Sequence, residues 1–130
     1  MSNTLNRVLY VEDEADIRTI AEIALQEFGG LIVQTAGSGA EALAMAAADP
    51  PDVILLDVMM PGMSGPTTLE RLRRDPATAG VPVIFMTAKV QAHEVAEYKT
   101  LGALDVIPKP FDPVTLADTV KDIWAHGGRR

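Results

Sequence analysis

Five polar residues stand at or directly after the ends of short apolar runs. If these runs are parallel strands of one sheet, their carboxyl ends meet at one edge and the five side chains converge there. Each pair of carboxylates about 4 Å apart then costs on the order of 4 kcal/mol at an effective dielectric of about 20, so a cation must neutralise them. Oxygen ligands of this kind favour Mg²⁺, and a lysine adds a further positive charge. The five residues are Glu12, Asp13, Asp57, Thr87 and Lys109.

This set of groups suits phosphoryl transfer. A phosphoryl group in transfer develops charge on three oxygens, which a metal ion, a lysine and a hydroxyl can each stabilise. An aspartate in the middle of such a set can act as the nucleophile and form an acyl phosphate. We therefore expect Asp57 to be the nucleophile, surrounded by a metal ion, the Lys109 ammonium and the Thr87 hydroxyl.

The elements that must position these residues alternate regularly along the chain. Each short apolar run is followed by a longer amphipathic stretch, which predicts five strand-helix units and an α/β fold. The fold class we expect is a doubly wound, five-stranded parallel sheet with five helices on its two faces. The third run is apolar at every position, as is typical of a strand covered on both faces. The predicted strands lie in 8–11, 31–33, 53–56 and 81–86, and 102–110 contains a fifth short strand and its turn.

The helices carry more specific expectations. Ser38 and Glu41 have the spacing of a capping box at the start of the second helix. Asp112 is expected to cap the last helix, with Pro113 at its first position. The fourth helix, in 94–101, has only a thin apolar stripe and should be the least firmly docked. The first helix should bury one face made of Ile17, Ile20, Ala21, Ala24, Leu25 and Phe28.

Length and composition limit the remaining possibilities. The chain has 130 residues, of which 48% are hydrophobic, so we expect one domain over 1–130 with a core at about 6–126. A net charge of −7 argues against binding to nucleic acid or an anionic membrane. The sequence contains no cysteine and two distant histidines, which removes thiol chemistry and a histidine metal site. Neither a leader nor a membrane-spanning run is visible, so we expect a cytoplasmic location.

Four motifs in order give the chain a resemblance to a known family. It resembles the receiver domains of two-component response regulators, and most closely the stand-alone, chemotaxis-regulator-like type. The resemblance covers the whole chain and implies a flavodoxin-like sheet with the strand order 2-1-3-4-5, as in the chemotaxis members of this family. The motifs are LYVEDE at 9–14, VILLDVMMPG at 53–62, MTA at 86–88 and KPF at 109–111.

The resemblance also implies roles for individual residues. Asp57 would accept a phosphoryl group from a phosphohistidine on a sensor histidine kinase or a histidine phosphotransfer protein. Glu12, Asp13 and Asp57 would hold Mg²⁺ together with the backbone carbonyl of Met59. The chain would then be a signalling module that catalyses only its own phosphorylation and dephosphorylation, and not an enzyme acting on other substrates.

The same resemblance implies a switch. Thr87 and Lys109 would contact the phosphoryl oxygens, the Lys109–Pro110 bond would be cis, and an aromatic residue on the fifth strand would follow Thr87 inward. Here that strand carries Val106 at the switch position. We therefore expect activation to depend on the loop after Thr87 and on the fourth helix. The downstream protein target would bind the face formed by the fourth helix, fifth strand and fifth helix.

Two other functions remain open from the sequence. A Mg²⁺-dependent phosphatase that forms an aspartyl phosphate would use the same nucleophile, but Met59 occupies the place where such enzymes often carry a second acid/base carboxylate. An unphosphorylated, receiver-like interaction scaffold is the other alternative, and Val106 weakly favours it. Glu14 is interpreted as part of an acidic first helical turn and not as a metal ligand.

Overall fold

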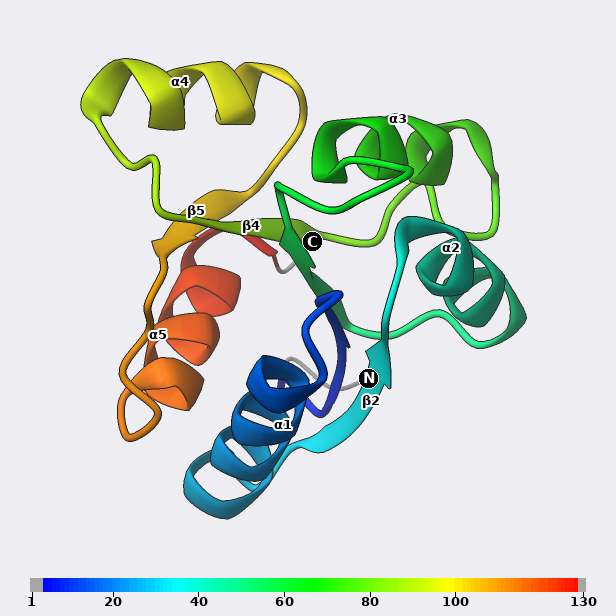
Figure 1. Cartoon of the computed structure of the whole chain (residues 1–130). Coiled ribbons are helices and arrows are strands. Elements are labelled where there is room, and N and C mark those ends of the chain that lie inside the picture. Colours follow the sequence, from blue (N-terminus) through cyan, green and yellow to red (C-terminus); the bar gives the residue numbers. More distant parts are fainter. Residues whose placement is uncertain (1–3, 129–130) are drawn as a thin grey trace.

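The sheet places the predicted strand ends side by side. In the computed structural model, which describes residues 4–128, five parallel strands form one sheet in the order β2-β1-β3-β4-β5 (Figure 1). This order confirms the predicted topology. The strands are β1 Arg7–Val11, β2 Ile32–Ala36, β3 Val53–Asp57, β4 Val83–Thr87 and β5 Asp105–Pro108.

Helices cover both faces of the sheet. Helices α1 and α5 pack on one face, and α2, α3 and α4 lie on the other (Figure 1). Within residues 4–128 no helix is both long and apolar enough to cross a membrane. The helices are α1 Ala15–Gly29, α2 Gly39–Ala48, α3 Gly65–Arg74, α4 Ala92–Thr100 and α5 Leu116–Ile123, and α5 runs on into a π-helical turn, η1 Trp124–Gly128.

The two faces of the sheet carry two hydrophobic clusters. One packs under α1 and α5 and includes Leu25 and Val120, and the other packs under α2 and α3 and includes Ala42 and Leu72. Every residue of β3 and of β4 is buried, which confirms the prediction for the third strand. Asp57, the last residue of β3, is therefore held by a strand that is packed from both sides.

Two expectations about helices were wrong in detail. The buried face of α1 consists of Ala21, Ala24 and Leu25, whereas Ile20 and Phe28 are 47% and 57% exposed. Both exposed residues lie at the flanks of the stripe that faces the sheet, where no neighbouring element covers them. Periodicity alone predicted too wide a buried face.

The start of α5 also differs from the expectation. Residues 112–115 form a turn, and α5 begins at Leu116. The Asp112 carboxylate accepts a hydrogen bond from Val114 N at 2.9 Å, and the Asp112 carbonyl accepts from Leu116 N at 3.0 Å. Asp112 therefore caps the turn that leads into the helix, and Pro113 lies in this turn.

The expected cap of α2 is present with one change. Ser38 Oγ accepts a hydrogen bond from Glu41 N at 3.1 Å, as predicted. Glu41 Oε1 reaches back to Gly37 N at 2.7 Å, one residue earlier than in a standard capping box.

Candidate phosphorylation site

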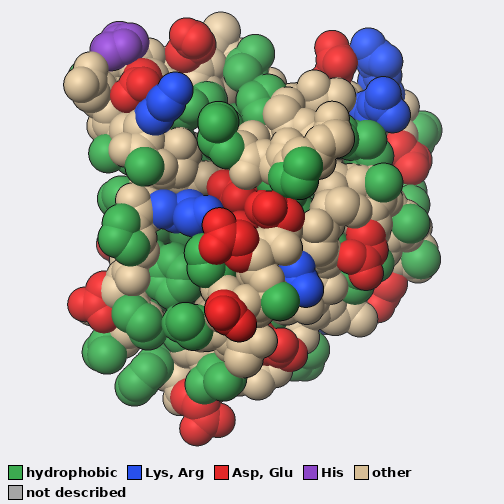
Figure 2. Space-filling model, in the orientation of Figure 1, with side chains coloured by type: hydrophobic (Ala, Val, Ile, Leu, Met, Phe, Trp, Pro, Cys, Tyr) green, Lys and Arg blue, Asp and Glu red, His purple; other side chains and the backbone are tan. Residues whose placement is uncertain are grey.

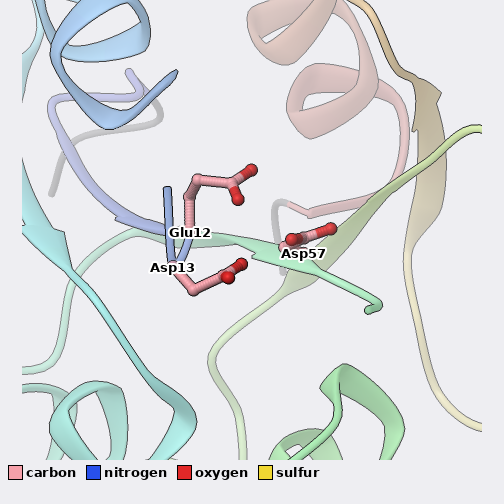
Figure 3. Close-up of side chains that lie close together, drawn as sticks. All are labelled: Glu12, Asp13 and Asp57. Carbon is pink, nitrogen blue, oxygen red and sulfur yellow. The ribbon is translucent and has the colours of Figure 1, made fainter. Parts of the chain in front are cut away.

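Three carboxylates meet where β1 and β3 end. Glu12 and Asp13 follow β1 directly, and Asp57 is the last residue of β3. Their carboxylate oxygens lie within 4.8 Å of one another. Figure 3 shows the three side chains pointing toward the same space from the two strand ends. The convergence predicted from the strand ends is therefore present.

Lys109 closes the site from the end of β5. Its Nζ donates a hydrogen bond to Glu12 Oε1 at 2.7 Å and lies 3.3 Å from Asp57 Oδ1. Its backbone N donates to the Thr87 carbonyl at 2.9 Å, so the loop that carries the lysine is tied to the end of β4. The Lys109–Pro110 peptide bond is cis, as the resemblance implied.

The electrostatics of the site favour a further cation. Burial, followed by the charge of Glu12, raises the pKa of Asp57 to about 6, although Lys109 opposes this rise. Burial by itself would lower the pKa of Lys109, but its hydrogen bonds and charge contacts with Glu12 and Asp57 outweigh it and raise that pKa. Three carboxylates beside one ammonium leave the site with excess negative charge. Figure 2 shows acidic side chains gathered in the middle of one face, beside a basic one.

Thr87 lies at the end of β4 next to the acidic cluster. The residue is 3% exposed, and its Oγ1 accepts a hydrogen bond from Lys89 N at 3.1 Å. The hydroxyl therefore holds the start of the loop that leads to α4. Val106 pairs with Phe85 in the sheet register and is half-buried. The structure thus places Thr87 at the site and Val106 one strand further out, without an aromatic ring on β5.

The β3–α3 loop packs closely against the backbone of Asp57. Gly65 N donates a hydrogen bond to the Val58 carbonyl at 2.9 Å, and a Cβ on Gly65 would lie only 2.6 Å from the Asp57 carbonyl oxygen. Glycine is therefore required for this close approach. The side chain of Met59 is 69% exposed at the rim. The use of its carbonyl as a metal ligand stays a prediction.

Sequence reasoning did not identify Arg18. This residue of α1 donates from Nη1 to the Glu12 carbonyl at 2.7 Å and to the Asp13 carbonyl at 3.3 Å. It therefore ties the loop bearing two carboxylates to the helix that follows. The only signal in the sequence is an arginine one turn into that helix, which is equally typical of a solvated helix face.

Glu14 does not join the cluster, in agreement with its interpretation as a first-turn residue. It occupies the N-cap position of α1, and its side chain makes no cap hydrogen bond. Its backbone N donates to Glu12 Oε2 at 3.3 Å. The group of carboxylates close enough to share a metal ion, among the residues described, is Glu12, Asp13 and Asp57.

Known proteins are similar to this chain in sequence and in fold. The chain is 42% identical over 118 residues to "Response regulator PleD" of Caulobacter vibrioides, covering 90% of this chain and 26% of that protein. It is 38% identical to the phosphate regulon regulator PhoB of Pseudomonas aeruginosa, covering 93% of this chain and 52% of PhoB. The chain thus spans about a quarter of PleD and half of PhoB.

Relatives and structures of similar length also match. "Protein PilH" of Pseudomonas aeruginosa is 33% identical, with 92% of this chain and 98% of PilH covered. The structure of the chemotaxis response regulator CheY4 of Vibrio cholerae has a TM-score of 0.84 and 35% identity, with 92% of this chain and 99% of that one covered. The family model described as "Response regulator receiver domain" matches residues 8–121. The chain therefore belongs to the receiver domains of two-component response regulators, the phosphoacceptor domains of these signalling systems.

Proposed function

We propose that Asp57 is the phosphoacceptor and that the phosphoryl group comes from a phosphohistidine on a sensor histidine kinase or a histidine phosphotransfer protein. One observation carries this proposal: the oxygens of Glu12, Asp13 and Asp57 lie within 4.8 Å of one another, and Lys109 Nζ lies 3.3 Å from Asp57 Oδ1. Asp57 ends a fully buried strand, so its carboxylate is presented at the rim in one orientation.

The transfer follows from the positions of these groups. A carboxylate oxygen of Asp57 attacks phosphorus, the phosphorus–nitrogen bond breaks, and the imidazole of the donor keeps the electron pair and takes up a proton. Lys109 turns from Glu12 to one phosphoryl oxygen, and the Thr87 hydroxyl donates to another. Because the pKa of Asp57 is about 6, its carboxylate is mostly ionised and nucleophilic at neutral pH.

The same residues fit a magnesium ion. The donor set consists of the carboxylates of Glu12, Asp13 and Asp57, with the Met59 carbonyl as a further oxygen, and its excess negative charge calls for a divalent cation. When bound, Mg²⁺ neutralises charge on the phosphoryl oxygens. Receiver domains generally bind Mg²⁺ in such an acidic pocket, and we propose that this chain does so.

The output is a change in protein contacts. Response regulators interact with histidine kinases or phosphotransfer proteins, and we propose that the downstream target binds the face of α4, β5 and α5. A hollow of about 420 Å³ lies on this face and is lined by residues including Lys99, Leu104 and Ile123. We further propose that residues 1–130 act as one domain, with a core at about 6–126, and that it acts in the cytoplasm without turnover of other substrates.

Intact mass measurement tests the proposal. With acetyl phosphate and Mg²⁺ we expect one phosphate adduct, which Asp57→Asn abolishes and the matched variant Asp112→Asn retains. Steady turnover of phosphate monoesters would favour an aspartyl-phosphate phosphatase instead. The absence of an adduct on the wild-type protein would favour an unphosphorylated interaction scaffold and overturn the proposal.

A further inference from the structure

Arg73 is a half-buried cation that the proposed function does not use. It lies in the last turn of α3, where its Nη1 donates a hydrogen bond to the Val81 carbonyl at 2.7 Å and its Nη2 donates to the Gly102 carbonyl at 3.4 Å. Val81 and Gly102 precede β4 and β5, so Arg73 lies near the amino ends of these strands. The phosphorylation site lies at the opposite edge of the sheet.

The guanidinium of Arg73 can still bind a further group. Arginine has five N–H donors, and the two hydrogen bonds to carbonyl groups leave three of them without a protein acceptor among the residues that the structure describes. Within the same part of the chain, Arg73 forms no ion pair with a carboxylate. Burial lowers the pKa of Arg73, but an arginine stays charged at neutral pH. A half-buried charge without a counterion favours an anionic ligand.

Arg73 lines two hollows in the surface beside α3. One hollow has a volume of about 490 Å³ and lies between α3 and the end of α4, and the other has a volume of about 420 Å³ and lies beside the turn that joins α4 to β5. The two helices are neighbours on the same face of the sheet (Figure 1). We call the two hollows together the α3–α4 groove. The first is lined by Pro66, Thr67, Glu70, Arg73, Arg74 and Leu101, and the lining of the second includes Arg73, Lys99 and Gly102.

The charged side chains that line the α3–α4 groove are mostly basic. Arg74 Nη2 lies 3.5 Å from Glu70 Oε2, and Lys99 Nζ lies 3.7 Å from Asp105 Oδ1. Both are exposed ion pairs, which contribute little to stability and can be exchanged for other partners. The groove is therefore basic although the whole chain has a net charge of −7. A basic groove of this kind attracts an acidic ligand.

An apolar side chain lies in the same groove. Leu101, at the C-cap of α4, is 53% exposed and lines the larger hollow together with Pro66. An aliphatic side chain of a ligand would cover this apolar surface, next to a carboxylate on the guanidinium of Arg73. A nucleic acid has phosphates but no aliphatic side chain, and the net charge of the chain opposes its approach. The observations therefore favour a segment of a protein.

We propose that the α3–α4 groove is a docking site for an acidic segment of a partner protein. A carboxylate of this segment binds the free N–H donors of Arg73 as a fork, and an adjacent aliphatic side chain packs on Leu101. Arg74 and Lys99 contribute further positive charge at the edges of the groove. The inference goes beyond the proposed function and does not depend on phosphorylation of Asp57.

Titration of the isotope-labelled protein with a short acidic peptide, followed by amide chemical shifts, tests this inference. The probe is acetyl-Glu-Glu-Leu-Glu-Glu-amide at an ionic strength of about 0.15 M. We expect a dissociation constant of about 1 mM or below, with the largest shifts at Thr67, Glu70, Leu101 and Gly102. The peptide with Gln in place of every Glu, and the peptide with Ser in place of Leu, should each bind at least about fivefold more weakly. Equal binding by either control peptide would overturn the inference.

Variants of the protein separate the groove from the general charge of α3. Arg74→Met and Leu101→Ser should each weaken binding of the peptide about fivefold, because each removes an exposed contact of the groove. Arg71→Met, at an exposed position of α3 outside the groove lining, should change it less than about twofold. Equal weakening by Arg71→Met and Arg74→Met would assign the effect to net charge and overturn the inference.

The role of Arg73 itself needs a variant that keeps the charge. Arg73→Lys retains a cation but loses the planar fork, and we expect it to weaken binding about fivefold. Binding unchanged in this variant would contradict the role of the guanidinium. Because Arg73 also holds two carbonyl groups, circular dichroism must show that the variant is folded. If it is not folded, Arg74→Met and Leu101→Ser decide the question.

Other occupants of the groove would give different results. An oligonucleotide of about ten thymidines that causes the same shifts at lower concentration than the peptide would point to nucleic acid and overturn the inference. Self-association of the protein that Leu101→Ser abolishes would show that a second copy of the chain covers the groove, and would overturn it as well. Failure is also distinct from failure of the proposed function, because a wild-type protein that forms the acetyl phosphate adduct but does not bind the peptide contradicts this inference alone.

Discussion

The two halves of the rim at the carboxyl ends of the strands are built differently. In the acidic half, Glu12 and Asp57 are 1% and 4% exposed, and they follow or end strands packed on both faces. Lys109 spans the gap between them, and Arg18 holds the β1–α1 loop from outside. The carboxylates of Glu12 and Asp57 can therefore adopt few conformations.

The other half, formed by α4 and the loop that leads to it, is loosely attached. Helix α4 has no buried residue, which confirms the prediction of weak docking. The ring of Tyr98 packs edge-on against Phe85 at 5.3 Å between centroids, and Lys99 lies 3.7 Å from Asp105 on β5. Helix α4 thus contributes half-buried and exposed side chains, such as Tyr98 and Lys99, to these contacts.

The difference matches the demands of a phosphorylation switch. Transfer of a phosphoryl group requires oxygen atoms held in a fixed geometry, because small displacements reduce the rate strongly. A readout element must instead move for a free energy that one new phosphoryl group can supply, and reversing a two-state equilibrium from 1:99 to 99:1 takes about 5.5 kcal/mol. Weak docking of α4 lowers the free energy that the phosphoryl group must supply to move this helix.

Replacing a valine by alanine on a buried strand and on α4 should give the largest difference in the free energy of unfolding. Val83→Ala on the buried strand β4 should lower the free energy of unfolding by about 2–3 kcal/mol. Val95→Ala on α4 should cost less than about 1 kcal/mol, because Val95 is half-buried and alanine favours a helix. Urea unfolding of both variants measures this, and equal losses would remove the contrast between the halves.

The burial of Asp57 should appear as a pH dependence of stability in the absence of metal. Its pKa of about 6 lies above the ordinary 3.8, so the protonated form is favoured by folding. That contribution is fully present below about pH 4 and is lost as the pH rises through about 6. Near pH 4 the free energy of unfolding of Asp57→Asn should therefore be similar to that of the wild type. At pH 7.5 it should be higher by about 2 kcal/mol.

Urea unfolding in EDTA across this range provides the measurement. Asp16→Asn, in the first turn of α1, is the matched control, because Asp16 is exposed and should give no such rise. If the difference in the free energy of unfolding between Asp57→Asn and the wild type stayed constant from about pH 4 to 7.5, folding would not disfavour the ionised form of Asp57.

Loosening the acidic half should weaken metal binding. Arg18→Met removes the hydrogen bonds to the Glu12 and Asp13 carbonyls and should reduce Mg²⁺ affinity about fivefold, or about 1 kcal/mol. Calorimetric titration with Mg²⁺ measures the change. Arg71→Met, at an exposed position on α3, serves as the control for loss of one positive charge, and an equal loss of affinity there would assign the effect to charge alone.

The smallest expected effect concerns the movement of the loop after Thr87 and of α4. On addition of beryllofluoride and Mg²⁺ we expect amide chemical-shift changes to extend from Ala88 to Leu101, because Thr87 holds the start of this segment through Lys89 N. The amide signal of Val106 should shift less than the signals of these residues, because the side chain of Val106 is small. An unchanged spectrum from Ala88 to Leu101 would contradict a readout through α4.

Much of the site could be predicted from strand ends. Glu12, Asp57 and Lys109 each end an apolar run, and parallel strands bring such ends to one edge whatever the details of packing. Arg18 could not be assigned in this way. The importance of Arg18 depends on which carbonyl groups its guanidinium reaches, and this does not follow from residue type or spacing.

The buried faces of the helices were less predictable than the strands. A strand apolar at every position has to be covered on both sides, so β3 followed from composition alone. Along α1, Ile20 and Phe28 fit the helical period as well as Leu25 does, and only the placement of α5 and the sheet decides which are covered.

The sequence by itself determined the α/β alternation, the buried strands and the residue types at their ends, because these depend on local patterns of hydrophobicity and on chain order. Tertiary structure decided the distances: Lys109 Nζ lies 2.7 Å from Glu12 Oε1 and 3.3 Å from Asp57 Oδ1. Such contacts join residues up to 97 positions apart, so they are set by the packing of the whole sheet.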